Sequence, residues 1–231
     1  MRRYNLAVLR ISETHWIQAE QQRVGTEEML LYSDHEEENA PQTQAVALML
    51  SKGAQNSLRR WESHGSRIIK ASFKTKEGVT MKVIQRYEPT NNSNDDIKDQ
   101  FYERLQSITE NCLRKDLTIL MGDLSAKVGM DNTGYEDNMG RHGLGETKME
   151  RFANLCAFNI LVIGGTISPH KATWISPDHT TENRIDHICI NKKFRRTMED
   201  MRTRRGTYIY SDHQLVVAKM KLKLKKHWTA G

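Results

Sequence analysis

Apolar runs separated by polar stretches mark the first predicted elements of the chain. Leu6 to Ile11 and Ala45 to Leu50 are short apolar runs that predict strands, and the second is apolar enough to be central in a sheet. Ile68 to Phe73 and Val79 to Tyr87 predict a hairpin, because a polar turn that ends in Gly78 joins them.

The pattern changes to helical spacing from Asp95. Apolar residues then recur in steps of four and three on one face of a helix that Asn94 can cap: Ile97, Phe101, Leu105, Ile108 and Cys112. The later elements are a strand from Leu117 to Met121, a helix from Met149 to Ala157, a strand from Ile160 to Ile163, and a final half-buried strand in which Ala218, Met220, Leu222 and Leu224 alternate with lysines. With no linker and no repeat, the sequence predicts one domain over residues 1–231.

Composition adds a modest preference for an anionic partner. Thirty-five Lys and Arg against 29 Asp and Glu give a formal charge of +6, which favours a polyanion but equally fits an ordinary basic surface. The basic segment 192–205 is interpreted as a solvated helix face, with contact to a DNA backbone as the less favoured alternative. Three cysteines in apolar contexts, and no secretory or membrane-spanning pattern, predict an intracellular protein, with the nucleus as a plausible site.

Acidic residues at strand ends form the candidate site. Because a sheet sandwich can gather strand ends at one rim, we expect these carboxylates to meet. Carboxylates hold hard cations such as Mg²⁺ or Mn²⁺, and a His paired with Asp can orient or deprotonate a water. The motifs are Ser12-Glu13-Thr14, Gly122-Asp123, Arg184-Ile185-Asp186 and Ser211-Asp212-His213.

These motifs, in this order and with a Tyr-x-Pro-Thr step that begins at Tyr87, resemble the endonuclease/exonuclease/phosphatase superfamily. Within it, the chain is most similar to the apurinic-like endonuclease domain of RTE-type non-LTR retrotransposons and to the craniofacial development protein 2-like family of host proteins. The phrases that carry this similarity are Ile11-Ser12-Glu13-Thr14-His15-Trp16, Gly122-Asp123-Leu124-Ser125-Ala126-Lys127-Val128-Gly129, Thr173-Trp174-Ile175-Ser176-Pro177-Asp178 and Asn183-Arg184-Ile185-Asp186-His187-Ile188.

The resemblance implies an α/β fold, a four-layer DNase I-like sandwich of two packed mixed β-sheets flanked by helices, here N-terminally truncated and lacking its first strand. It implies a metal-dependent endonuclease that nicks DNA, with Mg²⁺ as cofactor and Mn²⁺ as a substitute. The implied roles are: metal binding by Glu13, assisted by Asp212; orientation or activation of water by Asp123; phosphate contact by the Asp186 and His213 pair and by Tyr87; a catalytic position at Ser125; and DNA contact by Thr173 and Trp174.

Other interpretations stay open. Taken singly, Glu13 is typical of a surface carboxylate, Tyr87 of a packed strand aromatic and Trp174 of rim packing. Three departures from the family pattern favour a catalytically degenerate, vestigial or DNA-binding remnant: the missing strand, Ser125 in place of Asn, and Arg10 where a small Gly is usual. A phosphatase of the same fold is a third alternative, which the retrotransposon-like phrases disfavour. Nothing indicates a membrane or an obligate protein partner.

Overall fold

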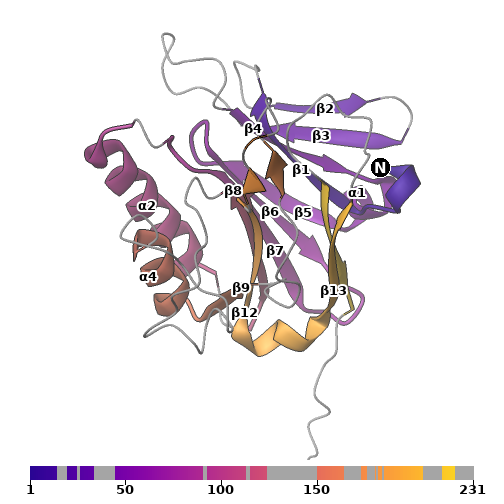
Figure 1. Cartoon of the computed structure of the whole chain (residues 1–231). Coiled ribbons are helices and arrows are strands. Elements are labelled where there is room, and N and C mark those ends of the chain that lie inside the picture. Colours follow the sequence, from indigo (N-terminus) through magenta and orange to yellow (C-terminus); the bar gives the residue numbers. More distant parts are fainter. Residues whose placement is uncertain are drawn as a thin grey trace, which may run out of the picture.

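Two packed β-sheets form the centre of the computed structural model (Figure 1), which describes residues 1–14, 20–24, 27–33, 45–90, 93–112, 115–123, 150–163, 173–175, 180, 182–183, 185–204 and 215–221. The larger sheet has the order β5-β6-β7-β8-β12-β9, and it is mixed because β7 and β8 run parallel while its other described pairs are antiparallel. Its strands are β5 (Leu58–Ser63), β6 (Ile68–Lys74), β7 (Thr80–Tyr87), β8 (Leu117–Asp123), β9 (Leu161–Ile163) and β12 (Asp186–Asn191).

The second sheet is antiparallel, in the order β1-β4-β3-β2. Its strands are β1 (Val8–Thr14), β2 (Glu20–Val24), β3 (Glu28–Tyr32) and β4 (Ala45–Leu50). Two ribbons complete the described strands: β10 (Trp174–Ile175) with β11 (Glu182–Asn183), and β13 (Met198–Arg204) with β14 (Leu215–Met220). The helical segments are η1 (Arg2–Tyr4), α1 (Lys52–Ser57), α2 (Asp95–Glu110), α4 (Glu150–Phe158) and η2 (Lys192–Thr197).

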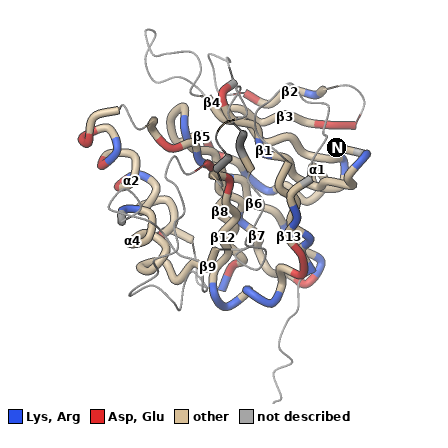
Figure 2. The backbone as a smooth tube through the Cα atoms, viewed as in Figure 1, with Lys and Arg blue, Asp and Glu red and all other residues tan. Residues whose placement is uncertain are grey.

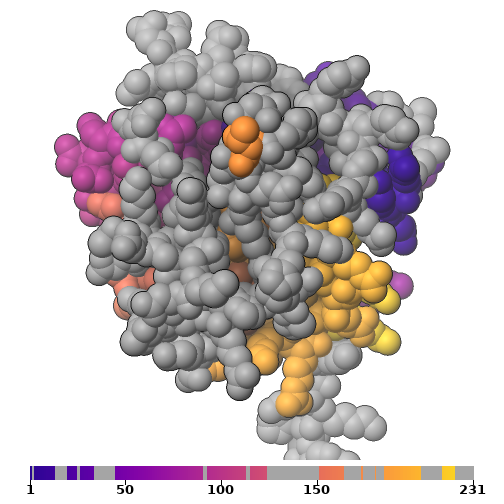
Figure 3. All heavy atoms as spheres, in the orientation of Figure 1, coloured from indigo at the N-terminus to yellow at the C-terminus, as the bar shows by residue number. Residues whose placement is uncertain are grey.

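The central part of the larger sheet is buried on both faces, which explains why β8 and β9 are largely apolar. On β7, Ile84 packs into the core under helices α2 and α4, whereas its neighbour Val83 packs into the core between the two sheets. In the space-filling view (Figure 3), α2 and the N-terminal segment lie at opposite sides of the molecule, as this layer order requires. The expected DNase I-like α/β fold with two packed sheets is confirmed. Of the described strands, those of the larger sheet form a mixed sheet and those of the second sheet an antiparallel one, and α2 and α4 supply the helical layer on the larger sheet.

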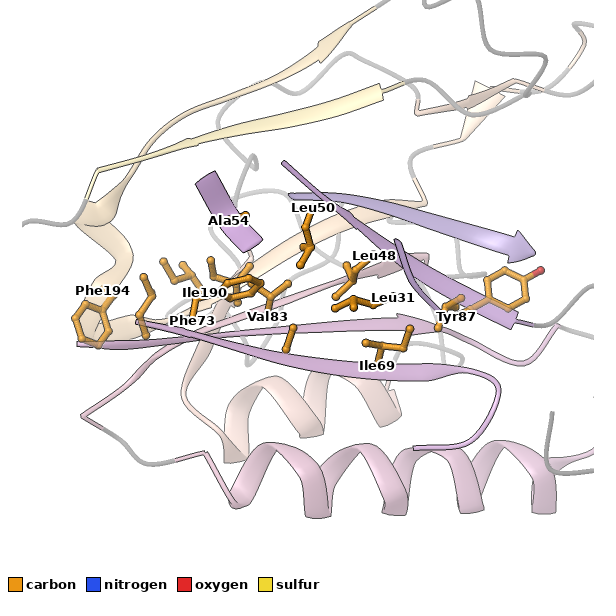
Figure 4. Packing of buried hydrophobic residues seen from close by; sticks show 14 of the residues in the cluster. Leu31, Leu48, Leu50, Ala54, Ile69, Phe73, Val83, Tyr87, Ile190 and Phe194 are labelled. Carbon is orange, nitrogen blue, oxygen red and sulfur yellow. The ribbon is translucent and has the colours of Figure 1, made fainter. Parts of the chain in front are cut away.

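The core between the sheets extends along the full length of the strands. Figure 4 shows Phe194 of η2 at one end of this cluster and Tyr87 at the other, with Leu48 and Leu50 of β4 above the larger sheet. Tyr87 therefore sits where the apolar core meets the rim, and its ring is fixed by packing while its hydroxyl points outward from the cluster.

The element predictions hold best where the pattern is longest. The strand from Ala45 to Leu50 and the helix from Asp95 are confirmed, and Asn94 caps that helix by accepting a hydrogen bond from the Ile97 N–H at 2.9 Å. The helix interpretation of segment 192–205 is wrong beyond η2. From Met198 the chain pairs as β13 with β14, because that pairing satisfies its backbone groups and lets Met198 pack against the inter-sheet core.

Gly122 on β8 is required by the close approach of β7. Arg86 lies directly opposite it in the parallel ladder, and a Cβ at position 122 would lie 2.4 Å from Arg86 Cγ and 2.5 Å from the Arg86 carbonyl oxygen. We expect Gly122→Ala to lower the free energy of unfolding by about 1–3 kcal/mol or more, because the second clash is with backbone. Urea unfolding followed by circular dichroism measures this.

Gly53→Ala is the matched control for that substitution. The nearest atom to a Cβ at position 53, Ser51 Oγ, is 3.9 Å away, and the residue lies in helix α1. This change should be neutral or stabilise by about 0.5–1 kcal/mol. Equal unfolding midpoints for the two variants would contradict the packing of Gly122 against Arg86.

Candidate active site

Strand register brings three of the expected site residues side by side at one end of the larger sheet. Tyr87 at the end of β7 is opposite Asp123 at the end of β8, and Asp123 is opposite Asp186 at the start of β12. All three are buried, and directly opposite residues on neighbouring strands project from the same face of a sheet. The expected gathering of Asp123 and Asp186 at one rim is therefore present in the structure.

Glu13 reaches this rim from the other sheet. The Tyr87 hydroxyl donates a hydrogen bond to Glu13 Oε1 at 2.8 Å, across 74 residues of sequence. Glu13 has a φ of 59°, in the left-handed region, and lies where the pairing of β1 with β4 shifts register between Ile11 and Thr14. Such bulges re-aim a side chain, and left-handed backbone in a residue other than Gly, Asn or Asp is concentrated at functional sites.

A second contact holds β1 against the larger sheet. The Gln85 side-chain amide, fully buried on β7, donates to the Ile11 carbonyl oxygen at 2.6 Å. Together with the bond between Tyr87 and Glu13, it fixes the bulged end of β1 over the ends of β7 and β8. The position of Glu13 is thus set by two residues of one strand.

Tyr87 is kept protonated by its surroundings. Burial raises the pKa of the Tyr87 phenol well above its ordinary value, the hydrogen bond to Glu13 and the charge of that carboxylate raise it further, and Arg67, with its guanidinium carbon 5.5 Å from the ring centre, lowers it slightly. A phenol has one hydrogen to donate, and here Glu13 receives it. In this arrangement Tyr87 positions Glu13, and the phosphate contact expected of it stays a prediction.

Arg10 on β1 enters the same rim and forms an ion pair through Nη2 with Asp186 Oδ1. The two side chains are 17% and 7% exposed, so the pair is largely shielded from water. Burial lowers the pKa of Arg10 to about 10 and the charge of Arg86 lowers it as well, whereas the carboxylates of Asp123 and Glu13 raise it. Arg10 is therefore still a cation at neutral pH.

Thr173 stabilises the backbone at the start of β12, where Asp186 lies. Its buried Oγ1 accepts hydrogen bonds from the backbone N–H groups of Ile185 and Asp186, each at 3.0 Å. This fixes the start of β12 and with it the Asp186 carboxylate. The DNA contact expected of Thr173 and Trp174 stays a prediction; the backbone of Trp174 pairs with Asn183 in β10, and its side chain lies outside the described residues.

Arg86 is a site residue that the sequence analysis missed. It is 1% exposed, donates through Nη1 to the Asp123 carbonyl oxygen at 3.0 Å, and lies with its guanidinium carbon 4.4 Å from the centre of the Phe152 ring. A charged residue directly before Tyr87, in an otherwise buried strand, was the available signal. The remaining expected residues, Ser125, Asp212 and His213, lie outside the described part of the chain.

The carboxylates at this rim are of the type that binds a hard cation, but the described residues do not supply enough of them for a metal site. Carboxylate oxygens are the ligands that Mg²⁺ takes, and Glu13 is exposed. Among the described residues, however, no three acidic, His or Cys side chains form a group that could hold a metal ion. Asp212, the expected second ligand, would have to contribute from the segment that is not described.

A separate cluster of basic residues lies on η2, away from this rim. Lys192, Lys193, Arg195 and Arg196 of η2 follow the end of β12 that is opposite Asp186, and Figure 2 shows this blue cluster at the far end of the larger sheet. At 3.3–3.4 Å per residue, β12 separates them from Asp186 by roughly 20 Å. If η2 binds a polyanion, it does so at a distance from the carboxylates.

Comparison with known proteins identifies the kind of domain. No protein-family model matches the chain. Over 97% of its length, the chain is 31% identical to craniofacial development protein 2 from Tragulus javanicus and, over the same share, 31% identical to the Bos taurus protein of that name. The chain is thus similar in sequence to craniofacial development protein 2 along nearly its whole length. It spans 39% and 38% of the length of these two relatives.

Solved structures place this chain in the DNase I-like fold. The endonuclease domain of TRAS1, a telomere-specific non-LTR retrotransposon, matches with a TM-score of 0.65 at 13% identity, over 95% of this chain and 88% of that domain. The 3′-5′ exonuclease NExo from Neisseria meningitidis matches with a TM-score of 0.60 at 18% identity, over 84% of this chain and 80% of that one. The fold is therefore the DNase I-like α/β fold of these nuclease structures, as the motifs led us to expect. Across the described ranges, no helix has the length and apolar character needed to cross a membrane.

The support that Thr173 gives to Asp186 can be tested by a substitution of similar shape. Thr173→Val removes the acceptor of two backbone N–H groups in a buried place, so we expect a loss of about 1–3 kcal/mol in the free energy of unfolding. Thr173→Ser keeps the hydroxyl and should lose less than half as much. Denaturant unfolding of both variants distinguishes the cases, and a Val variant as stable as wild type would show that these hydrogen bonds do not support the strand.

Proposed function

We propose that this chain is a metal-dependent endonuclease domain of retrotransposon ancestry, which hydrolyses a DNA phosphodiester and leaves a nick with a 3′-hydroxyl. The observation that supports it most directly is the register that aligns Tyr87, Asp123 and Asp186, with Glu13 hydrogen-bonded to Tyr87. Strands that are far apart in sequence thus bring the carboxylates of Glu13, Asp123 and Asp186 to one rim.

DNA is the proposed substrate for two reasons. One similar structure is an endonuclease domain of a retrotransposon, and NExo, a 3′ phosphatase in another structure, is seen bound to a product DNA hairpin. The formal charge of +6 would also favour association with a polyanion. Sequence motifs and fold similarity thus support the same class of substrate.

Hydrolysis of a phosphodiester needs a water that loses a proton and a partner for the charge that builds on the phosphate. In the proposed mechanism Asp123 orients the water and accepts its proton, while Asp186, with His213, contacts the scissile phosphate. Tyr87 holds Glu13 in place, and Ser125 supplies a hydroxyl donor near the reacting group. Mg²⁺ or Mn²⁺, held by Glu13 with the assistance of Asp212, would neutralise charge on the phosphate.

A second candidate function is a catalytically degenerate remnant that keeps the fold and at most binds DNA. The observation that favours it is the ion pair of Arg10 with Asp186, since a carboxylate occupied by a guanidinium is less available to a substrate or an ion. The two candidates differ in turnover and not in fold.

Nicking of supercoiled plasmid by the purified chain in Mg²⁺ tests the proposal. We expect metal-dependent nicking that EDTA abolishes and that Asp123→Asn lowers by about 100-fold or more, because the amide cannot accept the proton of the water. His213→Ala should give a loss of similar size. Asp96→Asn, an exposed carboxylate on helix α2, is the matched control and should nick like wild type.

The outcome that contradicts the proposal is equally specific. Folded wild-type protein that nicks no faster than Asp123→Asn in either Mg²⁺ or Mn²⁺ would exclude the endonuclease function for this chain. Retention of DNA on the same protein, measured by gel shift, would then support the remnant that binds DNA.

A further inference from the structure

Arg10 points into the molecule because of the register of its strand. It pairs with Leu48 of β4, which lies in the core between the two sheets, and Val8, two residues earlier, packs against the same core. Ile11, the next residue, packs on the other face of the sheet. Strand alternation therefore directs Arg10 toward the inter-sheet side, where a long side chain reaches the rim of the larger sheet.

The surroundings of Arg10 are those of a buried counter-ion. Its guanidinium is paired with Asp186, and the charges of Asp123 and Glu13 also act on it. One of its nitrogens, Nη1, is buried and has no hydrogen-bond partner among the described residues. The group is thus held at the rim by charge more than by a full set of hydrogen bonds.

A second guanidinium lies close by, since Arg86 opposes the charged form of Arg10. Arg86 itself packs against Phe152 on the helix side of the larger sheet, so it is Arg10 whose charge lies among the carboxylates of Glu13, Asp123 and Asp186. A divalent ion binds to uncompensated negative charge, and much of the negative charge at this rim already has a partner within the chain.

We propose that Arg10 is a resident counter-cation of the acidic rim, which competes with a divalent metal ion for the negative charge of Glu13, Asp123 and Asp186 and keeps the metal affinity of this chain low. The inference rests on the site described under the proposed function. It goes further by assigning one residue outside the carboxylate set as the determinant of metal affinity.

Mn²⁺ binding, measured by electron paramagnetic resonance of the free ion, tests the inference on the full chain. Arg10→Gln keeps polar bulk and removes the charge, so we expect Mn²⁺ to bind at least tenfold more tightly than to wild type. Arg10→Lys keeps the charge and should bind Mn²⁺ like wild type. Arg59→Gln removes the same charge from an exposed position on β5, the far edge strand of the larger sheet, and should leave the Mn²⁺ affinity unchanged.

Thermal unfolding gives a second readout that does not depend on catalysis. In metal-free buffer Arg10→Gln should melt below wild type, because the ion pair with Asp186 is lost, and added Mn²⁺ should raise the melting temperature of this variant more than that of wild type. Equal Mn²⁺ affinity in wild type and Arg10→Gln, or tighter binding by wild type, would overturn the inference.

A second variant keeps the test decisive if Arg10→Gln does not fold. Arg10→Met keeps the length and apolar packing of the side chain, removes the charge and leaves every carboxylate in place, so it should also bind Mn²⁺ at least tenfold more tightly than wild type. A chain that shows this gain but nicks no DNA loses the proposed function and keeps the counter-cation. A chain that nicks DNA without the gain does the reverse.

Discussion

The ion pair between Arg10 and Asp186 is the interaction on which the arrangement of the rim depends. It joins β1 of one sheet to β12 of the other, at the place where the described strands deliver their acidic residues. Removal of one partner from a buried ion pair typically costs about 3–5 kcal/mol, because the other charge is left without a partner. Such a pair fixes the spacing of the two sheets at this end, as the apolar cluster fixes it along the strands.

The other contacts at the rim follow from this constraint. With β1 held over the larger sheet, Gln85 bonds the Ile11 carbonyl oxygen and Tyr87 bonds Glu13, while Arg86 packs against Gly122 in the neighbouring strand. Gln85, Arg86 and Tyr87 all belong to β7, which pairs with the strand that carries Asp123. One central strand therefore carries both the core packing and the groups that position the acidic residues, so that fold and site are not separable here.

Much of the fold could be predicted because its signals are local. The α2 stripe and its Asn94 cap, and the apolar run of β4, are properties of short segments. The strands β2 and β3 were missed: Glu20–Val24 is exposed along its length, so it has no alternation of buried and exposed positions that would predict its hairpin with β3. The segment after Met198 was misassigned because its partner β14 lies more than ten residues further along the chain, and no local pattern shows that pairing.

The acidic residues of the site could be predicted from the sequence, but the ion pair of Arg10 with one of them could not. Strand ends identify Asp123 and Asp186 because a buried run that ends in an acid is visible in sequence, but register alone decides that these two face each other. The role of Tyr87 toward Glu13 depends on a bulge in β1, and the approach of Arg10 to Asp186 depends on which face of β1 is turned inward. Both are consequences of packing two sheets together.

The most direct test of this account is a double-mutant cycle on Arg10 and Asp186, with Arg10→Gln, Asp186→Asn and the double variant unfolded in urea. If the ion pair joins the sheets, the two changes will be coupled by about 1–3 kcal/mol in the free energy of unfolding, in the range of residues that share one network. Additivity within about 0.3–0.5 kcal/mol would show that the two residues act independently, and would contradict the central place given to the pair.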